Sequence, residues 1–235
     1  MQPLVLGHRG ASAHAADNTI EAFELAVAQG ADGVELDVRF TSDGVIVLNH
    51  DPDIGEMGPL IHHDFAAIRH SHPEVPTLDE ALAVLADLII NVEIKNSPGE
   101  PDFDPGDEMA DAIARWINTH DLHERVVVTS FHPETAAAVR RADPTVTTGQ
   151  LVAAGFRPAR DLDSIVAAGH QWVAPNIADV LADPVGIVTA VHNHGLRLAV
   201  WTVDDPVSIR TVAEAGVDAI ISNDPQTTLR VVSAV

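Results

Sequence analysis

The chain has 235 residues, which is the usual length of one parallel β/α barrel and enough to bury a single core. Its 35 acidic residues against 13 basic ones give a formal charge of -22, so the field of the protein repels nucleic acid and anionic membranes. The absence of cysteine excludes disulfides, thiolate metal sites and thiol nucleophiles. We therefore expect a single domain over residues 1–235, with no nucleic-acid partner and no stable membrane association. Composition does not predict the oligomeric state.

The N-terminal residues read as the first strand of the fold. The segment MQPLVLGHRG has neither the basic region of a signal peptide nor an apolar run long enough for a membrane span. We therefore predict a soluble, cytoplasmic protein.

Short apolar, β-branched runs alternate with amphipathic stretches of helical period along nearly the whole chain. This alternation is typical of repeated βα units and predicts an α/β fold with a parallel sheet. The expected strands are residues 4–7, 33–40, 45–49, 89–95, 126–131, 148–152, 172–175, 198–203 and 219–222. The expected helices are residues 19–29, 78–86, 107–119, 133–141, 161–168, 184–194, 206–215 and 225–232.

Nine strands are one more than a (β/α)8 TIM barrel needs. Residues 41–44, Thr-Ser-Asp-Gly, leave no room for a helix, and an Asp-Gly turn reverses the chain. We therefore interpret the run from Val45 as a small extra hairpin strand after the second barrel strand. A short insertion at about 51–76 and an irregular loop at 96–106 follow strand ends, where barrel enzymes place their active-site loops.

Carboxylates recur at alternate positions on two of the expected strands. Glu35 and Asp37 share one face of their strand, and Glu93 and Lys95 share one face of a later strand. Carboxylates about 6–7 Å apart repel each other unless a positive charge lies between them. In a chain without cysteine, three such acids predict a hard oxygen site for one divalent cation, Mg²⁺ or Ca²⁺. The alternative is that they are exposed charges at strand ends, and their regular spacing on apolar strands favours the metal.

Lys95 is the only lysine of the chain. A compact, movable ammonium group two residues from a carboxylate suits a phosphate oxygen or a sugar hydroxyl close to a metal. The alternative is an ion pair with Glu93 that allows both groups to be buried, and the two interpretations can coexist.

Two histidines stand at strand ends beside the proposed metal ligands. His8 precedes Arg9, whose planar fork suits phosphate, and a histidine can gain or lose a proton near neutral pH. His50 ends the hairpin strand. If residues 41–44 form the turn, residue 40 pairs with residue 45, which places His50 opposite Glu35. We interpret other histidines as surface residues, namely those at 62, 63, 70, 72, 120, 192 and 194.

Phosphodiester hydrolysis needs this combination of groups. A cation and an arginine offset the charge of the non-bridging oxygens, while a base and an acid act on opposite sides of phosphorus. The chain resembles the glycerophosphodiester phosphodiesterases, and the motifs follow the family's order almost from end to end. The matching residues are 8–10, 18–19, 21–23, 30–38, 41–44, 50–52, 76–82, 92–95, 130–131, 200–203 and 224–225.

The resemblance implies a TIM barrel of the phospholipase C-like phosphodiesterase type. It also implies metal-dependent hydrolysis of glycerophosphodiesters to glycerol 3-phosphate and an alcohol, with the substrate's own glycerol hydroxyl as the attacking group. The implied roles are metal ligands for Glu35, Asp37 and Glu93, general acid and base for His8 and His50, phosphate contacts for Arg9 and Lys95, and substrate walls for Trp201 at the glycerol end and Phe131 beside it.

The sequence departs from the family pattern in places that bear on the substrate. Ala16-Asp17 stands where Pro-Glu is usual, residues 54–56 lack a common arginine, and Asp204 replaces a more typical asparagine. Two other functions therefore stay open. One is a lysophospholipase D or sphingomyelinase D-like phosphodiesterase, although few aromatics and short loops argue against the apolar groove that it needs. The other is a barrel that binds a phosphodiester or a metal without turnover.

Overall fold

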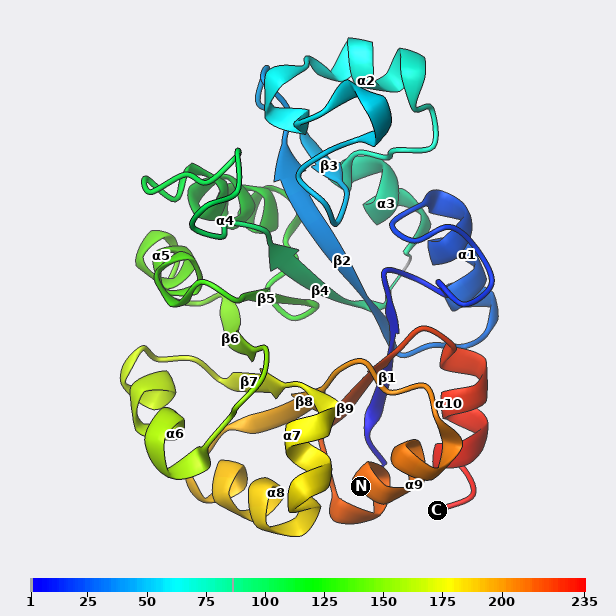
Figure 1. Ribbon diagram of the computed structural model, residues 1–235, viewed down its shortest axis with the longest axis vertical. Helices are drawn as coiled ribbons and strands as arrows, with labels where there is room; N and C mark the ends of the chain where they lie inside the picture. The colour runs from blue at the N-terminus through cyan, green and yellow to red at the C-terminus, as the bar shows by residue number, and fades with distance from the viewer. Residues whose placement is uncertain (1, 86) are drawn as a thin grey trace.

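The computed structural model describes residues 2–85 and 87–235. Within them nine strands form one sheet, in which β1 (Leu4–His8) pairs with both β2 (Gly33–Phe40) and β9 (Ala219–Ser222) and so closes a barrel (Figure 1). The parallel strands between β2 and β9 are β4 (Ile89–Ile94), β5 (Val126–Ser130), β6 (Thr147–Val152), β7 (Trp172–Pro175) and β8 (Arg197–Val200). The predicted eight-stranded TIM barrel is confirmed.

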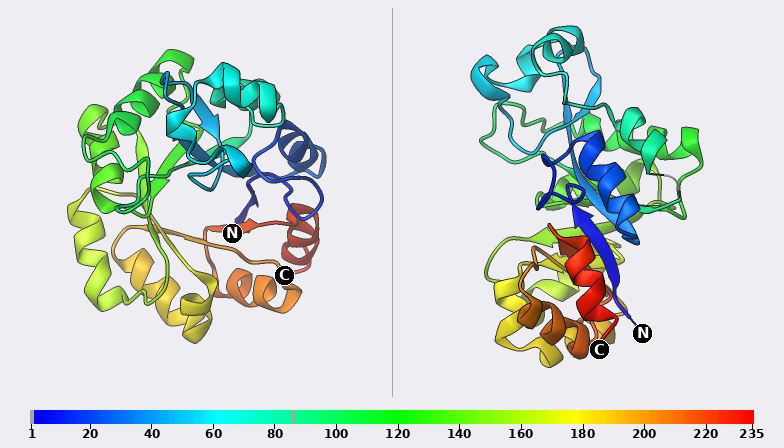
Figure 2. Two further views of the ribbon diagram at one scale, coloured as in Figure 1. Left: turned by 45° about the horizontal axis from the view of Figure 1, so that its top comes forward. Right: turned by 90° about the vertical axis from the view of Figure 1, so that its right-hand side faces the viewer.

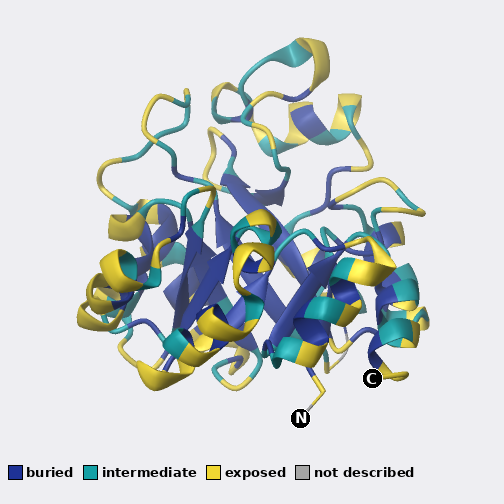
Figure 3. Cartoon of the chain, turned by 60° about the horizontal axis from the view of Figure 1, so that its bottom comes forward, coloured by how far each residue is buried: buried dark blue, intermediate teal, exposed yellow. Residues whose placement is uncertain are grey.

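Helices form an outer ring around the barrel, and their buried faces pack on the strands (Figures 2 and 3). The helices that follow barrel strands are α1 (Ile20–Ala28), α3 (Leu78–Val84), α4 (Glu108–His120), α5 (Pro133–Ala142), α6 (Pro158–Ala167), α8 (Pro184–Asn193), α9 (Pro206–Ala215) and α10 (Pro225–Val232). The helix predicted at residues 78–86 corresponds to α3, and its predicted end at residue 86 lies outside the described residues. No helix of the described chain is both long and apolar enough to cross a bilayer, and the cytoplasmic location stays a prediction.

Two short helices were not predicted from the sequence. The first, α2 (Phe65–Ser71), begins at Asp64, whose side chain accepts a hydrogen bond from a backbone N–H of the first turn. The second, α7 (Ile177–Ala182), begins in the same way at Asn176. Neither helix is long enough to show a helical period, so side-chain caps were the available signal for both.

The insertion after the hairpin has a small apolar centre of its own. It contains α2 and two 3₁₀ helices, Gly55–Met57 and Leu60–His62, and lies at the top of the molecule in Figure 1. Val47 from β3 (Ile46–Leu48) packs there with buried residues of the insertion. The predicted extra strand is confirmed, since β3 pairs antiparallel with β2 and, in the described part of the chain, with no other strand, although Val47 also forms an isolated bridge to Thr77.

The strand β2 fixes which side chains enter the barrel. Val34, Leu36 and Val38 are fully buried in the core between strands and helices, where each stabilises the fold by about 1.5–3 kcal/mol. If the pairing of β2 shifted by one residue, all three side chains would point into the barrel instead of towards the helices, so the register is strongly specified. Glu35 and Asp37 are thereby held inside the barrel, towards the carboxyl ends of the strands.

Candidate active site

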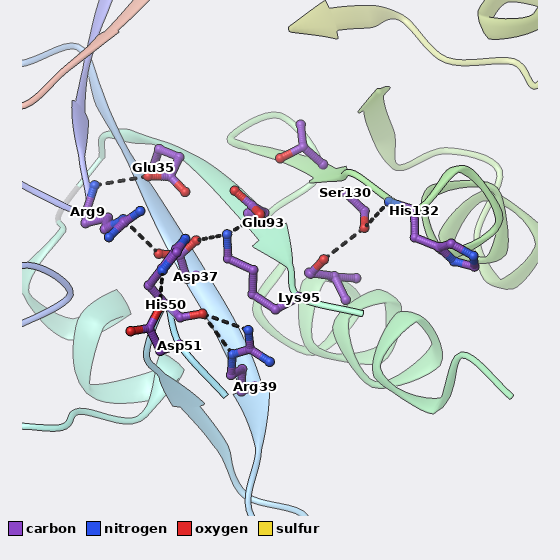
Figure 4. A network of polar contacts seen from close by, with 12 residues as sticks. Arg9, Glu35, Asp37, Arg39, His50, Asp51, Glu93, Lys95, Ser130 and His132 are labelled. Atoms are coloured by element: carbon purple, nitrogen blue, oxygen red, sulfur yellow. Dashed lines mark hydrogen bonds and ion pairs between the residues drawn. The ribbon is translucent and has the colours of Figure 1, made fainter. Parts of the chain in front are cut away.

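The predicted catalytic and substrate-contact residues surround one pocket at the carboxyl ends of the strands. The pocket has a volume of about 50 Å³ and is lined by all six of them, namely His8, Arg9, His50, Lys95, Phe131 and Trp201, together with Glu35 and Glu93. Two larger depressions, of about 340 and 720 Å³, share Arg9 with this pocket. Figure 4 shows the charged groups as they converge from β1, β2 and β4.

A second cavity of about 390 Å³ opens at the opposite end of the barrel. Its inner wall is mostly apolar, with Leu6, Ala199 and Ile221 among the lining residues, and none of the predicted site residues takes part. Its size therefore does not make it the better candidate for the chemistry.

The three predicted metal ligands lie together and are buried. The ligand oxygens of Glu35, Asp37 and Glu93 all lie within 4.8 Å of one another. The parallel register of β2 and β4 accounts for this, because it places Asp37 directly beside Glu93. Burial and the neighbouring carboxylates raise the pKa of Glu35 well above its ordinary value, and burial and Asp37 raise the pKa of Glu93 to about 7. The negative charge of the three carboxylates is thus incompletely balanced by positive groups of the protein.

The carboxylate of Glu35 supports the fit of a cation. Its Oε2 accepts a hydrogen bond from the Arg9 backbone N–H at 3.0 Å, whereas its buried Oε1 has no hydrogen-bond partner among the described residues. A buried acceptor without a partner is costly. An ion that prefers oxygen ligands would satisfy this atom and the two other carboxylates, so the three acids can hold a metal ion.

Lys95 and Arg9 supply positive charge beside the three acids. The Lys95 ammonium contacts the Glu93 carboxylate and lies 3.0 Å from Asp37 Oδ1. Arg9 Nε lies 3.1 Å from Asp37 Oδ2, and its Nη1 donates to Asp17 Oδ2 at 2.8 Å. Although burial opposes the change, Lys95 and Arg9 hold the pKa of Asp37 below its ordinary value. The shorter acid at position 17 therefore still reaches Arg9.

His8 is held by a chain of hydrogen bonds that sequence reasoning missed. Asn223 donates from Nδ2 to Asp204 Oδ2 at 2.6 Å, which turns its amide oxygen towards His8. His8 Nδ1 lies 2.7 Å from that oxygen and therefore carries the proton, while Nε2 faces the pocket 3.9 Å from Glu35 Oε2. Burial lowers the pKa of His8, with the Asn223 hydrogen bond opposing the change.

His50 approaches the pocket from a loop. Its side chain is 41% exposed, and Nδ1 lies 2.7 Å from Asp51 Oδ1. Its backbone carbonyl accepts two hydrogen bonds from Arg39, at 3.0 and 2.7 Å. His8 and His50 therefore line the same pocket, as expected from the sequence. The strand pairing that was expected to bring His50 there is different from the observed one.

The predicted pairing of the hairpin is wrong by one residue. Phe40 pairs with Ile46 instead of residue 45, so the ladder would set position 50 opposite position 36. The turn is longer than expected because Thr41 and Val45 close it, with a backbone hydrogen bond of 3.0 Å between them and a second from the Val45 N–H to the Thr41 hydroxyl. The ladder ends at Leu48, which leaves His50 free to bend towards the site.

Two aromatic rings form one wall of the pocket. Phe131 and Trp201 meet edge to face with ring centroids 5.4 Å apart. The indole N–H of Trp201 donates to the Ala174 carbonyl at 2.8 Å, which fixes the ring. The Lys95 ammonium lies 5.8 Å from the centre of the Phe131 ring. The arrangement pairs an apolar surface with the charged groups opposite.

Comparison with known proteins places this site in a family. The model of the glycerophosphoryl diester phosphodiesterase family matches residues 8–227, which include every predicted site residue. The chain belongs to this family. A glycerophosphodiester phosphodiesterase of Caldanaerobacter subterraneus subsp. tengcongensis is 30% identical over 249 residues, covering 99% of this chain and 98% of the relative. Membership confirms the resemblance seen in the sequence and makes the chain a phosphoric diester hydrolase.

Solved structures agree with the family assignment. A putative glycerophosphoryl diester phosphodiesterase from Silicibacter pomeroyi has 25% identity and a TM-score of 0.84, covering 99% of this chain and 94% of its own. A glycerophosphodiester phosphodiesterase from Thermotoga maritima has 25% identity and a TM-score of 0.82, covering 98% of each chain.

Proposed function

We propose that this enzyme hydrolyses glycerophosphodiesters to glycerol 3-phosphate and an alcohol, and that it needs one divalent cation, Mg²⁺ or Ca²⁺. The observation that carries the proposal is the convergence of three buried acids and two histidines on one pocket of a chain of this family. A phosphodiesterase from Oleispira antarctica, 20% identical with a TM-score of 0.81, was solved with its product sn-glycerol-3-phosphate. That ligand is the product we expect here.

The charged groups of the pocket suit a phosphodiester. Glu35, Asp37 and Glu93 would hold the cation, which when bound offsets charge on the non-bridging oxygens of the phosphate. Arg9 and Lys95 line the pocket and can donate hydrogen bonds to the same oxygens. In a protein of charge -22 they are the local positive charge that a phosphate requires. Trp201 and Phe131 offer the carbon atoms of the glycerol a surface to pack against.

The partners of the two histidines suggest which is the base and which the acid. His8 donates from Nδ1 to a neutral amide, so its Nε2 has a lone pair that can take the proton of the attacking hydroxyl. His50 Nδ1 lies 2.7 Å from Asp51 Oδ1, and this contact holds the ring in place at the same pocket. With His8 as the base, we infer that His50, the other histidine of the pocket, donates a proton to the departing alcohol.

The proposal is tested by incubating the purified enzyme with glycerophosphocholine and glycerophosphoethanolamine and following products by phosphorus NMR. We expect glycerol 3-phosphate with Mg²⁺, Ca²⁺ or Mn²⁺ present, no turnover in EDTA, and recovery when the cation is returned. His8→Ala and His50→Ala should each lower kcat by about 10² or more. Full activity in EDTA or in either variant would contradict the proposal, and faster turnover of lysophospholipids would favour the lysophospholipase D alternative.

A further inference from the structure

Arg39 is a buried cation that the proposed mechanism does not use. It follows Asp37 by two positions on β2, so its side chain leaves the same face of the strand, and it is only 1% exposed. Its Nε and Nη2 both donate to the His50 carbonyl, as Figure 4 shows. Its Nη1 donates to Asp102 Oδ2 at 2.5 Å, and Nη2 lies 3.0 Å from Glu100 Oε2. One side chain therefore joins three segments, namely β2, the residues after β3 and the loop 96–106.

The stability of the fold does not by itself account for this arrangement. Taking a guanidinium group and its partner carboxylates out of water costs several kcal/mol, and apolar side chains of similar volume are often at least as stabilising. The distinctive property of the arginine is its planar fork, which can hold a carbonyl and two carboxylates at once.

His50 has little else to fix it. The ladder of the hairpin ends at Leu48, and the last backbone bond along it runs from the Asn49 N–H to the Asp37 carbonyl at 3.1 Å. Among residues 2–85 and 87–235, Arg39 is the group that bonds to the His50 backbone, and the imidazole itself contacts the exposed Asp51. The orientation of a histidine that enters the pocket from a loop thus depends on the arginine beneath it.

We propose that Arg39 is a positioning residue for His50, and that it ties the His50 backbone to the loop 96–106 through Glu100 and Asp102. This inference rests on the proposed function, in which His50 protonates the departing alcohol. A displacement of about 1 Å at a catalytic group can cost about 10²-fold in rate. Loss of Arg39 should therefore lower kcat while leaving the groups that hold the phosphate, and hence KM, nearly unchanged.

The test uses Arg39→Met and a matched control, Arg125→Met. Arg125 holds the Leu88 carbonyl with Nε and Nη2, at 3.2 and 3.1 Å, at the opposite end of the barrel. Both variants lose the same kind of arginine–carbonyl contact, so the control measures the general cost of such a loss. We expect Arg39→Met to lower kcat on glycerophosphocholine by about 10–100-fold with KM within about 3-fold, and Arg125→Met to keep the kcat of the original enzyme.

Two further measurements separate positioning from a loss of folding. The p-nitrophenyl ester of glycerol phosphate releases an anion that needs no proton, so Arg39→Met and His50→Ala should both slow this substrate far less. The double variant should be no slower than His50→Ala alone, because the arginine acts through that histidine. If Arg39→Met does not fold, a double variant with Glu100→Gln and Asp102→Asn releases the loop while leaving the arginine in place. This variant should lower kcat on glycerophosphocholine by a smaller factor, again with KM nearly unchanged.

The proposal for Arg39 is overturned by a kcat equal to that of the original enzyme, by equal losses on both substrates, or by a loss that adds to that of His50→Ala. Each of these outcomes leaves the proposed function intact, provided that the original enzyme is active and His50→Ala is impaired. An inactive original enzyme, by contrast, would refute the proposed function itself.

Discussion

Replacing Glu93 by glutamine should stabilise the metal-free protein at alkaline pH. The raised pKa of Glu93 means that between its ordinary value of 4.5 and about 7 the folded state holds a proton that the unfolded state has lost. Stability contributed by this group therefore falls as the pH rises through that window and stays low above it. The shift corresponds to about 3 kcal/mol of free energy of unfolding at pH 8. For a chain of this length that is about 6–12 °C in Tm.

The assay compares thermal unfolding of the two proteins in EDTA at pH 5 and pH 8. The other titrating residues are common to both proteins, so the difference between them reports the Glu93 carboxyl together with its effects on the pKa values of Glu35 and Lys95. We expect Glu93→Gln to have the higher Tm at pH 8 and nearly the same Tm at pH 5. Excess Mg²⁺ or Ca²⁺ should reverse the order at pH 8, because the cation stabilises only the protein that keeps its ligand. A variant less stable in EDTA at pH 8, or an order that the cation leaves unchanged, would refute the reasoning.

Three other substitutions test separate parts of the structure. Asp204→Ala frees the Asn223 amide to turn its NH₂ group towards His8, so kcat should fall about tenfold, and nitrogen NMR should show a changed tautomer of the imidazole. Trp201→Ala removes a pocket wall and should raise KM more than it lowers kcat; the opposite split would argue against a substrate contact. Thr77→Ala removes a helix cap and should cost about 1 kcal/mol in a denaturant titration, with kcat unchanged.

The fold and the buried acids were predictable because they depend on regular patterns. A regular strand sends alternate side chains to opposite faces, so the apolar neighbours of Glu35 and Asp37 indicated where these acids point. The hairpin pairing was not predictable in the same way. The Thr41 hydroxyl closes the turn one residue later than the Asp-Gly pair suggests. A shift of one residue in the pairing cannot be recognised from the hydrophobic pattern of a strand as short as β3.

The residues that orient the histidines were missed for a different reason. Asn223 lies 215 positions from His8, and Asp102 lies 63 positions from Arg39, so no local spacing links either pair. One signal for Asn223 was present in the sequence. It directly follows the last strand, which is the neighbour of the first strand in a closed barrel, and polar residues at both strand ends must therefore meet. For Arg39, the alternation along β2 indicated the same face as Asp37, but nothing in the sequence indicated its partners.

The central claim is that Glu35, Asp37 and Glu93 share one cation next to the phosphate. Crystals of the enzyme soaked in Mn²⁺ test this directly through the anomalous scattering of the ion. We predict one strong peak per chain, bounded by oxygens of these three side chains, and no peak there in Glu35→Gln crystals treated in the same way. A peak elsewhere, or three acids that remain without an ion at saturating Mn²⁺, would contradict the account.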